Sequence, residues 1–426
     1  MKRTLAILLA IMMLLSLAPA AFAGTGASHT VKAYEPRRVR GAAASAEDEL
    51  DPHDLSMVRA FLETADENGV KNGVKLNPDY DPGDPATWVR MDHNEDWGDY
   101  IANGVTFWAE AGGKKRLDWV NFNDLDVFGP LDISDCEELQ YLYCSNTRVT
   151  SVTATRCFAL LEYVCSNSLI EYEDHSACDE LYYVDLSYNR LEGWYYSSLY
   201  PNLWYLDVSG NELERLALSN NPQLYTIRCS DNLITSFDIA ECPAIGELYA
   251  DHNRIESLDL SAFERLNAVS LLWNPLKRLD MTGCAVPRDT ITAEGGGAFG
   301  YAYTYEYDYA YNMITTEYLE AYPAGDADFV GWFDADGSAV SGEPIPDLEW
   351  MENTHLVARF ASPALLPGDA DRNGIVDTTD ALLVLRCALG ISGEAEDLMV
   401  NCDMDSSGVI DTTDALFILR AALGIG

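Results

Sequence analysis

A pattern of apolar residues and asparagine recurs every 21 or 22 residues through the middle of the chain. It reads Leu-x-x-Leu-x-Leu/Cys-x-x-Asn-x-Leu. A unit this short cannot bury its own apolar side chains, so the copies must stack, each adding one short strand to a parallel sheet. The clearest copies begin at Leu181, Leu203, Leu224, Ile245 and Leu266.

The asparagine of each copy is expected to bond backbone groups where the chain turns off the strand. Earlier copies begin at Leu117, Leu139 and Leu160 but are degenerate, because the asparagine position holds Leu125, Thr147 and Ser168. The array resembles the short, cysteine-containing leucine-rich repeats of secreted bacterial proteins. The resemblance implies a curved solenoid over 117–286, with a parallel sheet on its concave face.

An exposed first repeat needs a cap, and residues 51–116 are predicted to supply it. Apolar residues at helical spacing follow Asp54, which is the expected N-cap, and a loop rich in Pro and Asp runs from Asn77 to Trp88. Helix, loop and tryptophan before a repeat array resemble the N-terminal caps of the same class of proteins.

Variable strand positions of such a solenoid point into its concave face, and here they are aromatic and acidic. Tyrosine and tryptophan are common interface anchors, and beside carboxylates they can also stack on sugar rings. The alternative is a solvated sheet whose tyrosines merely suit β-structure. The candidate ligand-binding residues are Trp119, Tyr141, Tyr143, Tyr183, Tyr205, Asp207 and Tyr249.

Eight of the ten cysteines recur in phase with the repeats. Stacked, buried thiols explain that phase most simply, and disulfides are the alternative that export favours. Cys387 and Cys402 lie near the C-terminus, where a bridge between them is conceivable. Metal binding by cysteine is disfavoured because no C-x-x-C pair occurs.

Residues 288–361 change pattern. Tyr301 to Tyr311 alternates as a strand does, and Asp336-Gly337 predicts a hairpin turn. Phe329-Val-Gly-Trp-Phe-Asp-Ala-Asp-Gly resembles the small β-domain of internalin B-repeats. A C-terminal cap of the solenoid is a compatible interpretation, and 362–367 is predicted to be a linker.

The last segment, 368–426, contains one loop–helix unit twice, with copies 34 residues apart. Each loop offers oxygen atoms at positions 1, 3, 5, 7, 9 and 12, the arrangement that calcium loops use. Two Ca²⁺ sites are predicted, and the neutral Ser407 is expected to weaken the second. The ligands are Asp369, Asp371, Asn373, the carbonyl of Ile375, Asp377 and Asp380, then Asp403, Asp405, Ser407, the carbonyl of Val409, Asp411 and Asp414.

The duplicated loops, the Thr-Thr pair before each closing aspartate and the Leu-Arg helices resemble a type I dockerin. The resemblance implies an all-α, calcium-loaded module that docks on a scaffoldin cohesin in either of two symmetric orientations. It assigns cohesin contact to Thr378, Thr379, Arg386, Thr412, Thr413 and Arg420. Capping of the following helix is the alternative role for the threonines.

Residues 1–23 have the charged start, apolar run and Ala-Phe-Ala end of a secretory signal, and 24–50 reads as a flexible spacer. This signal predicts that the protein is secreted. Attachment to the cell surface through the scaffoldin is a further option. The formal charge of −42 argues against nucleic acid and anionic membrane as partners, and membrane insertion is not predicted.

The sequence therefore predicts a multi-domain α/β chain: a leucine-rich repeat solenoid, a small β domain and a dockerin. No G-x-S-x-G, H-E-x-x-H or phosphate-binding glycine loop occurs, so the protein is expected not to be an enzyme. The expected function is that of an adaptor in a cellulosome-like, polysaccharide-degrading complex, whose repeats bind an unknown protein or glycan. Carbohydrate binding without a scaffold, and adhesion to host cells, are the alternatives.

Overall fold

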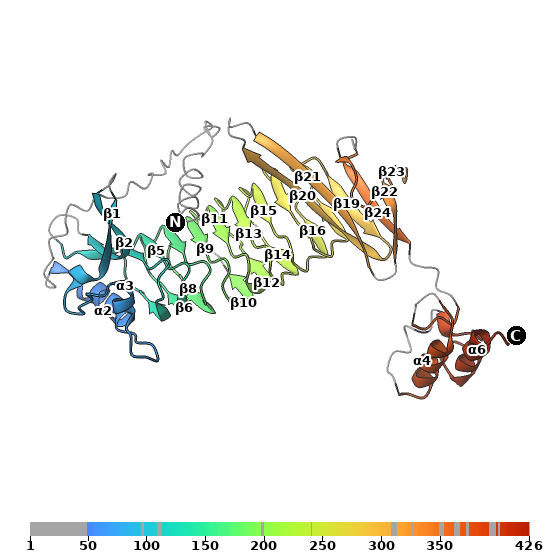
Figure 1. Cartoon of the computed structure of the whole chain (residues 1–426). Helices are drawn as coiled ribbons and strands as arrows, with labels where there is room; N and C mark the ends of the chain where they lie inside the picture. The colour runs from blue at the N-terminus through green and yellow to red at the C-terminus, as the bar shows by residue number, and fades with distance from the viewer. Residues whose placement is uncertain are drawn as a thin grey trace.

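The computed structural model describes residues 49–94, 98–108, 113–196, 200–239, 241–307, 313–324, 327–348, 353–361, 367–371, 375–391, 398 and 401–425. The predicted signal peptide, most of the predicted spacer, Asn373 and linker residues 362–366 lie outside them. The chain forms an elongated solenoid, and helices α4 (Thr378–Ala388) and α6 (Thr412–Ala422) lie beyond its C-terminal end (Figure 1).

One side of the solenoid is a 12-stranded sheet, which we call the long sheet. Its repeat strands pair in parallel, as the stacking of the units requires, and antiparallel hairpins close both ends. In spatial order it contains β1 (Val89–Asn94), β2 (Gly98–Trp108), β3 (Arg116–Asn121), β5 (Tyr141–Tyr143), β7 (Glu162–Val164), β9 (Tyr183–Asp185), β11 (Tyr205–Asp207), β13 (Thr226–Arg228), β15 (Glu247–Tyr249), β17 (Ala268–Ser270), β20 (Gly297–Tyr307) and β21 (Met313–Pro323).

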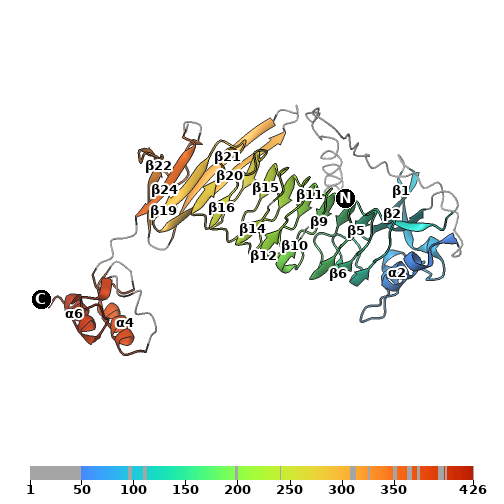
Figure 2. The same cartoon turned by 180° about the vertical axis from the view of Figure 1, so that it is seen from behind.

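The other side is divided into three sheets, which we call the short sheets (Figure 2). The first has β4 (Phe128–Asp132), β6 (Arg148–Thr153) and β8 (Tyr172–Asp174), and the second β10 (Glu192–Tyr196), β12 (Glu212–Ala217) and β14 (Ser236–Asp238). The third has, in spatial order, β16 (Ser257–Asp259), β18 (Arg278–Asp280), β19 (Thr290–Glu294), β24 (His355–Ala361), β22 (Asp328–Phe333) and β23 (Ala339–Ser341). β8 and β10 are thus consecutive strands that do not pair.

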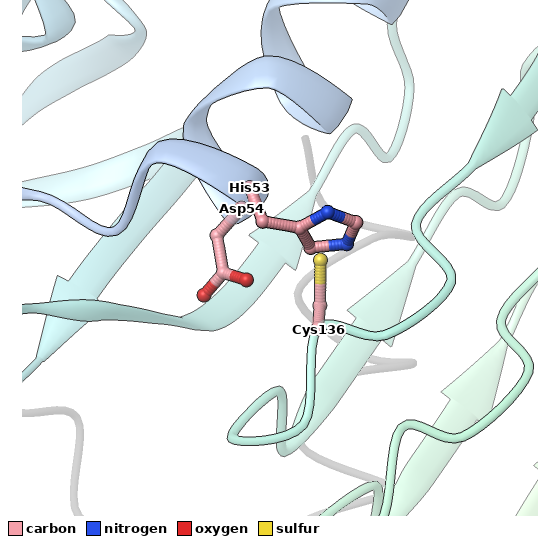
Figure 3. A group of neighbouring side chains, drawn as sticks. All are labelled: His53, Asp54 and Cys136. Atoms are coloured by element: carbon pink, nitrogen blue, oxygen red, sulfur yellow. The ribbon is translucent and has the colours of Figure 1, made fainter.

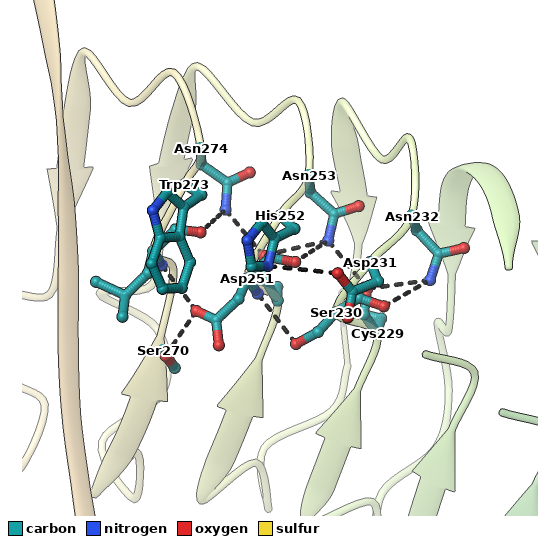
Figure 4. A network of polar contacts seen from close by, with 12 residues as sticks. Cys229, Ser230, Asp231, Asn232, Asp251, His252, Asn253, Ser270, Trp273 and Asn274 are labelled. Atoms are coloured by element: carbon teal, nitrogen blue, oxygen red, sulfur yellow. Dashed lines mark hydrogen bonds and ion pairs between the residues drawn. The ribbon is translucent and has the colours of Figure 1, made fainter. Parts of the chain in front are cut away.

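A ladder of buried asparagines holds successive repeats together (Figure 4). The Asn253 amide donates to the carbonyls of Cys229 (2.9 Å) and Ala250 (3.2 Å), and its oxygen accepts from the Ile234 N–H (2.9 Å). In the repeats predicted to be degenerate, the hydroxyls of Thr147 and Ser168 both donate to the Cys144 carbonyl, at 2.8 and 2.9 Å. Hydroxyls therefore replace the asparagine there, and the ladder continues.

The cysteines divide into two groups. Cys144 and Cys165, on adjacent repeats, form a disulfide with 4.5 Å between their Cα atoms, so the expectation of reduced, stacked thiols is wrong for this pair. Parallel strands bring equivalent positions of neighbouring repeats close enough to bridge. The remaining cysteines, including Cys387 and Cys402, do not form disulfides; those in the array are buried or half-buried, as stacked apolar residues would be.

The N-terminal cap begins with helix α2 (Pro52–Leu62), followed by α3 (Asn72–Leu76) and η2 (Pro85–Thr87). The predicted N-cap is wrong: Asp51 caps α2 by accepting from the N–H groups of His53 and Asp54. The Asp54 side chain is instead fully buried, where it accepts from Arg116 Nε and the Leu117 N–H, both at 2.8 Å. It thus ties the cap to the first repeat strand.

Residues 288–361 continue both sides of the solenoid. Hairpin β20–β21 pairs with β17 and extends the long sheet, while β19 pairs with β18 and extends the third short sheet. Buried Arg288 joins the two halves through a 2.7 Å ion pair with Glu317. This segment caps the repeat array rather than forming a sheet of its own, and β22–β23 is a hairpin around Gly337.

Candidate calcium sites and binding surfaces

Two clusters of carboxylates lie in the C-terminal module, one before each helix. Asp369, Asp371 and Asp380 form the first, and Asp403, Asp405 and Asp414 the second. In each cluster, one oxygen from every carboxylate lies within 4.8 Å of the others. The structure thus brings together positions 1, 3 and 12 of both loops.

The last aspartate of each loop is buried and organises the loop backbone. Asp380 is fully buried; Oδ1 accepts from the N–H groups of Ala370 (2.8 Å) and Asp371 (3.0 Å), and Oδ2 from that of Asp377 (2.7 Å). The fully buried Asp414 repeats this arrangement with Met404 and Asp411.

The position-9 aspartates, which are predicted to be calcium ligands, also cap the helices. Asp377 and Asp411 are the N-caps of α4 and α6, each accepting from the N–H two residues on at 2.6 Å. Neither belongs to a carboxylate cluster. The hydrogen bond from the Thr379 N–H lowers the pKa of Asp377, and that from the Thr413 N–H lowers the pKa of Asp411. Coordination of calcium by Asp377 and Asp411 stays a prediction.

The remaining predicted ligands differ between the loops. Asn373 lies outside the described residues, and Ile375 follows that gap. In the second loop, the Ser407 hydroxyl donates to the Val409 carbonyl at 3.1 Å, so two predicted ligands pair with each other. The donor set of carboxylate and carbonyl oxygens fits calcium, which takes hard oxygen ligands. Bound calcium would neutralise the carboxylates and fix each loop against its helix.

The two threonine pairs open the helices and are exposed. Since Asp377 and Asp411 are the caps, helix capping does not account for Thr378, Thr379, Thr412 and Thr413. Arg386 and Arg420 are exposed in the last turn of the same helices.

Sequence reasoning missed an apolar surface on both helices. Leu382 and Leu416 occupy equivalent positions and are 54% and 55% exposed; Leu389 and Leu423 are equivalent as well, at 58% and 57%. The inward face of each helix is also apolar, with Val384 and Ile418 fully buried between them. Leucine at i, i+3 and i+7 beside a buried stripe is the sequence signal that identifies it. Large apolar residues left exposed in a repeated pattern mark an interaction surface.

The predicted columns of the long sheet lie in register. Trp119, Tyr141, Tyr183 and Tyr205 belong to one column, and Tyr143, Asp207 and Tyr249 to the next. Their side chains are half-buried, while the residue between each pair points into the core. The rings of Tyr183 and Tyr205 stack with centroids 4.4 Å apart.

Carboxylates lie between these tyrosines. Glu162 accepts from Tyr143 at 2.6 Å and from Tyr182, and Glu247 accepts from Tyr305 of the C-terminal hairpin. Burial and the neighbouring carboxylate of Asp207 raise the pKa of Asp185 to about 6. The surface is therefore acidic and rich in hydrogen-bonding oxygens.

A third group, His53, Asp54 and Cys136, lies in the cap (Figure 3). Asp54 is already engaged by Arg116, and His53 Nε2 bonds the Ser134 carbonyl at 2.8 Å. Burial raises the pKa of the Cys136 thiol well above neutrality, so it stays protonated. This group is a structural junction between cap and array.

Residues 367–422 match the family model of the dockerin type I domain. Dockerin type I domains bind calcium and cohesin. Among curated proteins, a putative leucine-rich repeat protein of Acanthamoeba polyphaga mimivirus is 28% identical over 126 residues. That match covers 29% of this chain and 28% of the relative, so the chain spans less than a third of the relative's length.

Three solved structures were also found. The LRIM1/APL1C complex has a TM-score of 0.29 at 17% identity, over 42% of this chain and 32% of that chain. The leucine-rich repeat domain of APL1B has a TM-score of 0.24 at 20% sequence identity, and the match covers 38% of this chain and 62% of that chain. The third structure is the functional domain of InlJ from Listeria monocytogenes, which includes a cysteine ladder. It has a TM-score of 0.19 at 15% sequence identity, and the match covers 58% of this chain and 75% of that chain. The chain joins a solenoid of stacked repeat strands to a C-terminal segment that matches the dockerin type I family model. No helix among the described residues is long and apolar enough to cross a membrane.

Proposed function

We propose that this protein is a secreted, non-catalytic adaptor that docks on a scaffoldin cohesin through its dockerin and presents its repeats to a second partner. The single observation that carries the proposal is the matched exposure, on α4 and α6, of a threonine pair, an arginine and an apolar stripe. Leucine-rich repeats and dockerins are typically binding modules, which supports a role without catalysis.

Two calcium ions are proposed, one at each carboxylate cluster. Asp369, Asp371 and Asp380 would hold the first, with the Ile375 carbonyl completing it. The equivalent cluster around Asp403 would hold the second. Since Ser407 is neutral and pairs with the Val409 carbonyl, the second site is proposed to be weaker.

Duplication of the docking surface gives a sharp test. Either copy is proposed to face the cohesin, so replacing Thr378 and Thr379 with alanine, or Thr412 and Thr413, leaves binding through the other copy. All four replacements together should weaken binding at least about 100-fold, the loss expected when two side-chain contacts at the centre of an interface are removed.

The assay is binding of the full chain to a panel of type I cohesins, with and without a chelator. Thr315→Ala with Thr316→Ala is the matched control, because this adjacent, exposed pair lies on β21, outside the dockerin. Calcium-dependent binding that survives the fourfold replacement would overturn the assignment of the threonines. Absence of any cohesin partner would overturn the docking proposal.

The outward face of the long sheet is proposed as the second binding surface, with the stacked Tyr183 and Tyr205 at its centre. Its tyrosines and carboxylates suit a polypeptide or a sugar, and the secreted, polysaccharide-degrading context is part of the proposal. Adhesion to host cells is the competing function. The test compares the binding of the wild-type chain and of a Tyr183→Ala, Tyr205→Ala variant to immobilised glycans and to cells. This comparison distinguishes glycan binding from adhesion to host cells.

A further inference from the structure

Core positions on the short-sheet side change from aliphatic to polar at one point of the solenoid. Paired residues of the first short sheet run Leu131, Val152, Glu173 along one inward column. The same column resumes in the second sheet as Tyr195, Leu216 and Phe237. The acid and the tyrosine thus occupy aliphatic positions on β8 and β10, which are consecutive strands that do not pair.

His175, two residues after Glu173, continues this polar group. The equivalent residues of the two preceding repeats are Ile133 and Ala154, both fully buried. His175 is 3% exposed; its Nδ1 bonds the Glu173 carboxylate, and its ring stacks on Tyr200 with centroids 5.0 Å apart. Polar residues at core positions destabilise a repeat array, so their presence calls for a function.

Two buried polar atoms in this group have no hydrogen-bond partner among the described residues: Nε2 of His175 and the hydroxyl of Tyr195, which is 4% exposed. A buried group left unpaired costs about 1–3 kcal/mol. Burial lowers the pKa of His175, but the charge and hydrogen bond of Glu173 raise it by more, so its pKa lies above the ordinary value.

Both atoms belong to residues that line an open pocket of about 410 Å³ between β8 and β10. The pocket is large enough for a small ligand. Three exposed aromatic residues surround it: Tyr172, Trp194 and Tyr196 are 58%, 53% and 59% exposed. Glu171 and Glu192 add carboxylates to its lining.

We propose that this pocket binds one ring of a neutral saccharide, at a site separate from the long-sheet face. The apolar face of a sugar ring stacks on the exposed aromatics. Its hydroxyls can also donate to the carboxylates. Those same carboxylates repel acidic sugars.

A cationic peptide is the competing class of ligand. The observations favour the sugar for two reasons. The guanidinium of Arg215 already lies 4.7 Å from the centre of the Trp194 ring, so this chain supplies the cation itself. An imidazole that gains a proton, as the raised pKa of His175 favours, repels an ammonium or guanidinium.

The test is binding of the full chain to an array of neutral oligosaccharides, with polygalacturonate and an oligo-arginine peptide as further probes. Trp194→Ala with Tyr196→Ala removes two exposed rings and should abolish saccharide binding. Tyr195→Phe keeps the buried ring and removes a hydroxyl that is not accessible from the pocket, so it should leave binding unchanged. Trp273→Ala is the matched control, since Trp273 is also 53% exposed but stacks on His252 far along the array.

Saccharide binding lost in the double variant and retained in Trp273→Ala supports the proposal. Three results overturn it: no neutral saccharide binds, binding is lost in Tyr183→Ala instead of at the pocket, or only oligo-arginine binds and the double variant abolishes that. None of these outcomes depends on the dockerin, so failure here leaves the docking proposal standing.

Discussion

Removal of calcium should unfold the dockerin and leave the solenoid folded. The dockerin core is small, consisting of Ala381, Val384, Cys402, Ile410, Ala415 and Ile418. Two clusters of three carboxylates lie beside it, and without a cation the carboxylates of each cluster repel one another. The solenoid core, by contrast, is one continuous cluster of aliphatic and aromatic residues from the cap to β24.

The magnitude follows from the number of clusters. A ligand present at 100 times its dissociation constant stabilises the folded state by about 2.7 kcal/mol per site, so two sites contribute about 5 kcal/mol. That is at the lower end of the total stability of a small domain. For a module of this size, 1 kcal/mol shifts the melting temperature by about 4–8 °C, which predicts a shift of about 20–40 °C on chelation.

Differential scanning calorimetry of the full chain is the assay, with calcium and with a chelator. The dockerin transition should move and the solenoid transition should not. Asp369→Asn and Asp403→Asn disable one cluster each, and each should produce part of the shift, the smaller part for Asp403→Asn because the second site is proposed to be weaker. A dockerin transition at the same temperature in both conditions would refute the reasoning.

Further predictions concern the solenoid. The pKa of Asp185 is raised to about 6 in the folded protein, so folding is favoured while this carboxyl group is neutral. That contribution to the stability of the protein is lost as pH rises through about 6. Asp185→Asn should therefore stabilise the protein by about 1–3 kcal/mol at pH 7 and change little below pH 4, in thermal melts at both pH values. Asn211→Ala removes bonds to the Leu186 and Val208 carbonyls and from the Leu191 N–H, and should cost about 3 kcal/mol or more in urea unfolding. Peptide mapping without reductant should recover Cys144 linked to Cys165, and reduction should lower stability by about 3 kcal/mol, the effect of opening a loop of 21 residues.

Strand positions in the array could be predicted because two short periods act together. The 21- or 22-residue step fixes which residues are equivalent, and the alternation within a strand fixes which of them point outward. Tyr183 and Tyr205 therefore stack where the pattern placed them. Thr147 and Ser168 looked like interruptions because the asparagine role depends on hydrogen bonds to carbonyls, which a hydroxyl can also make.

Pairing between distant segments could not be predicted in the same way. Nothing local in Gly297–Tyr307 indicates that it pairs with β17, because antiparallel closure of a solenoid depends on edges formed elsewhere in the chain. In the dockerin, one spacing has two meanings. An aspartate three residues before another is both a loop ligand at position 9 and half of a capping box, and Asp377 takes the second role.

Glu173 and Tyr195 point to a division of labour between the two sides of the solenoid. On the long sheet, polar and aromatic residues stand at outward positions, where they do not interrupt the core. On the short sheets, polar residues occupy inward positions, and the sheet itself is broken between them. β14 and β16 also do not pair with each other, but only the break between β8 and β10 coincides with these inward polar residues and with the pocket that they line. Because this pocket is on the side opposite the long sheet, we expect that both faces can be occupied while the dockerin is docked.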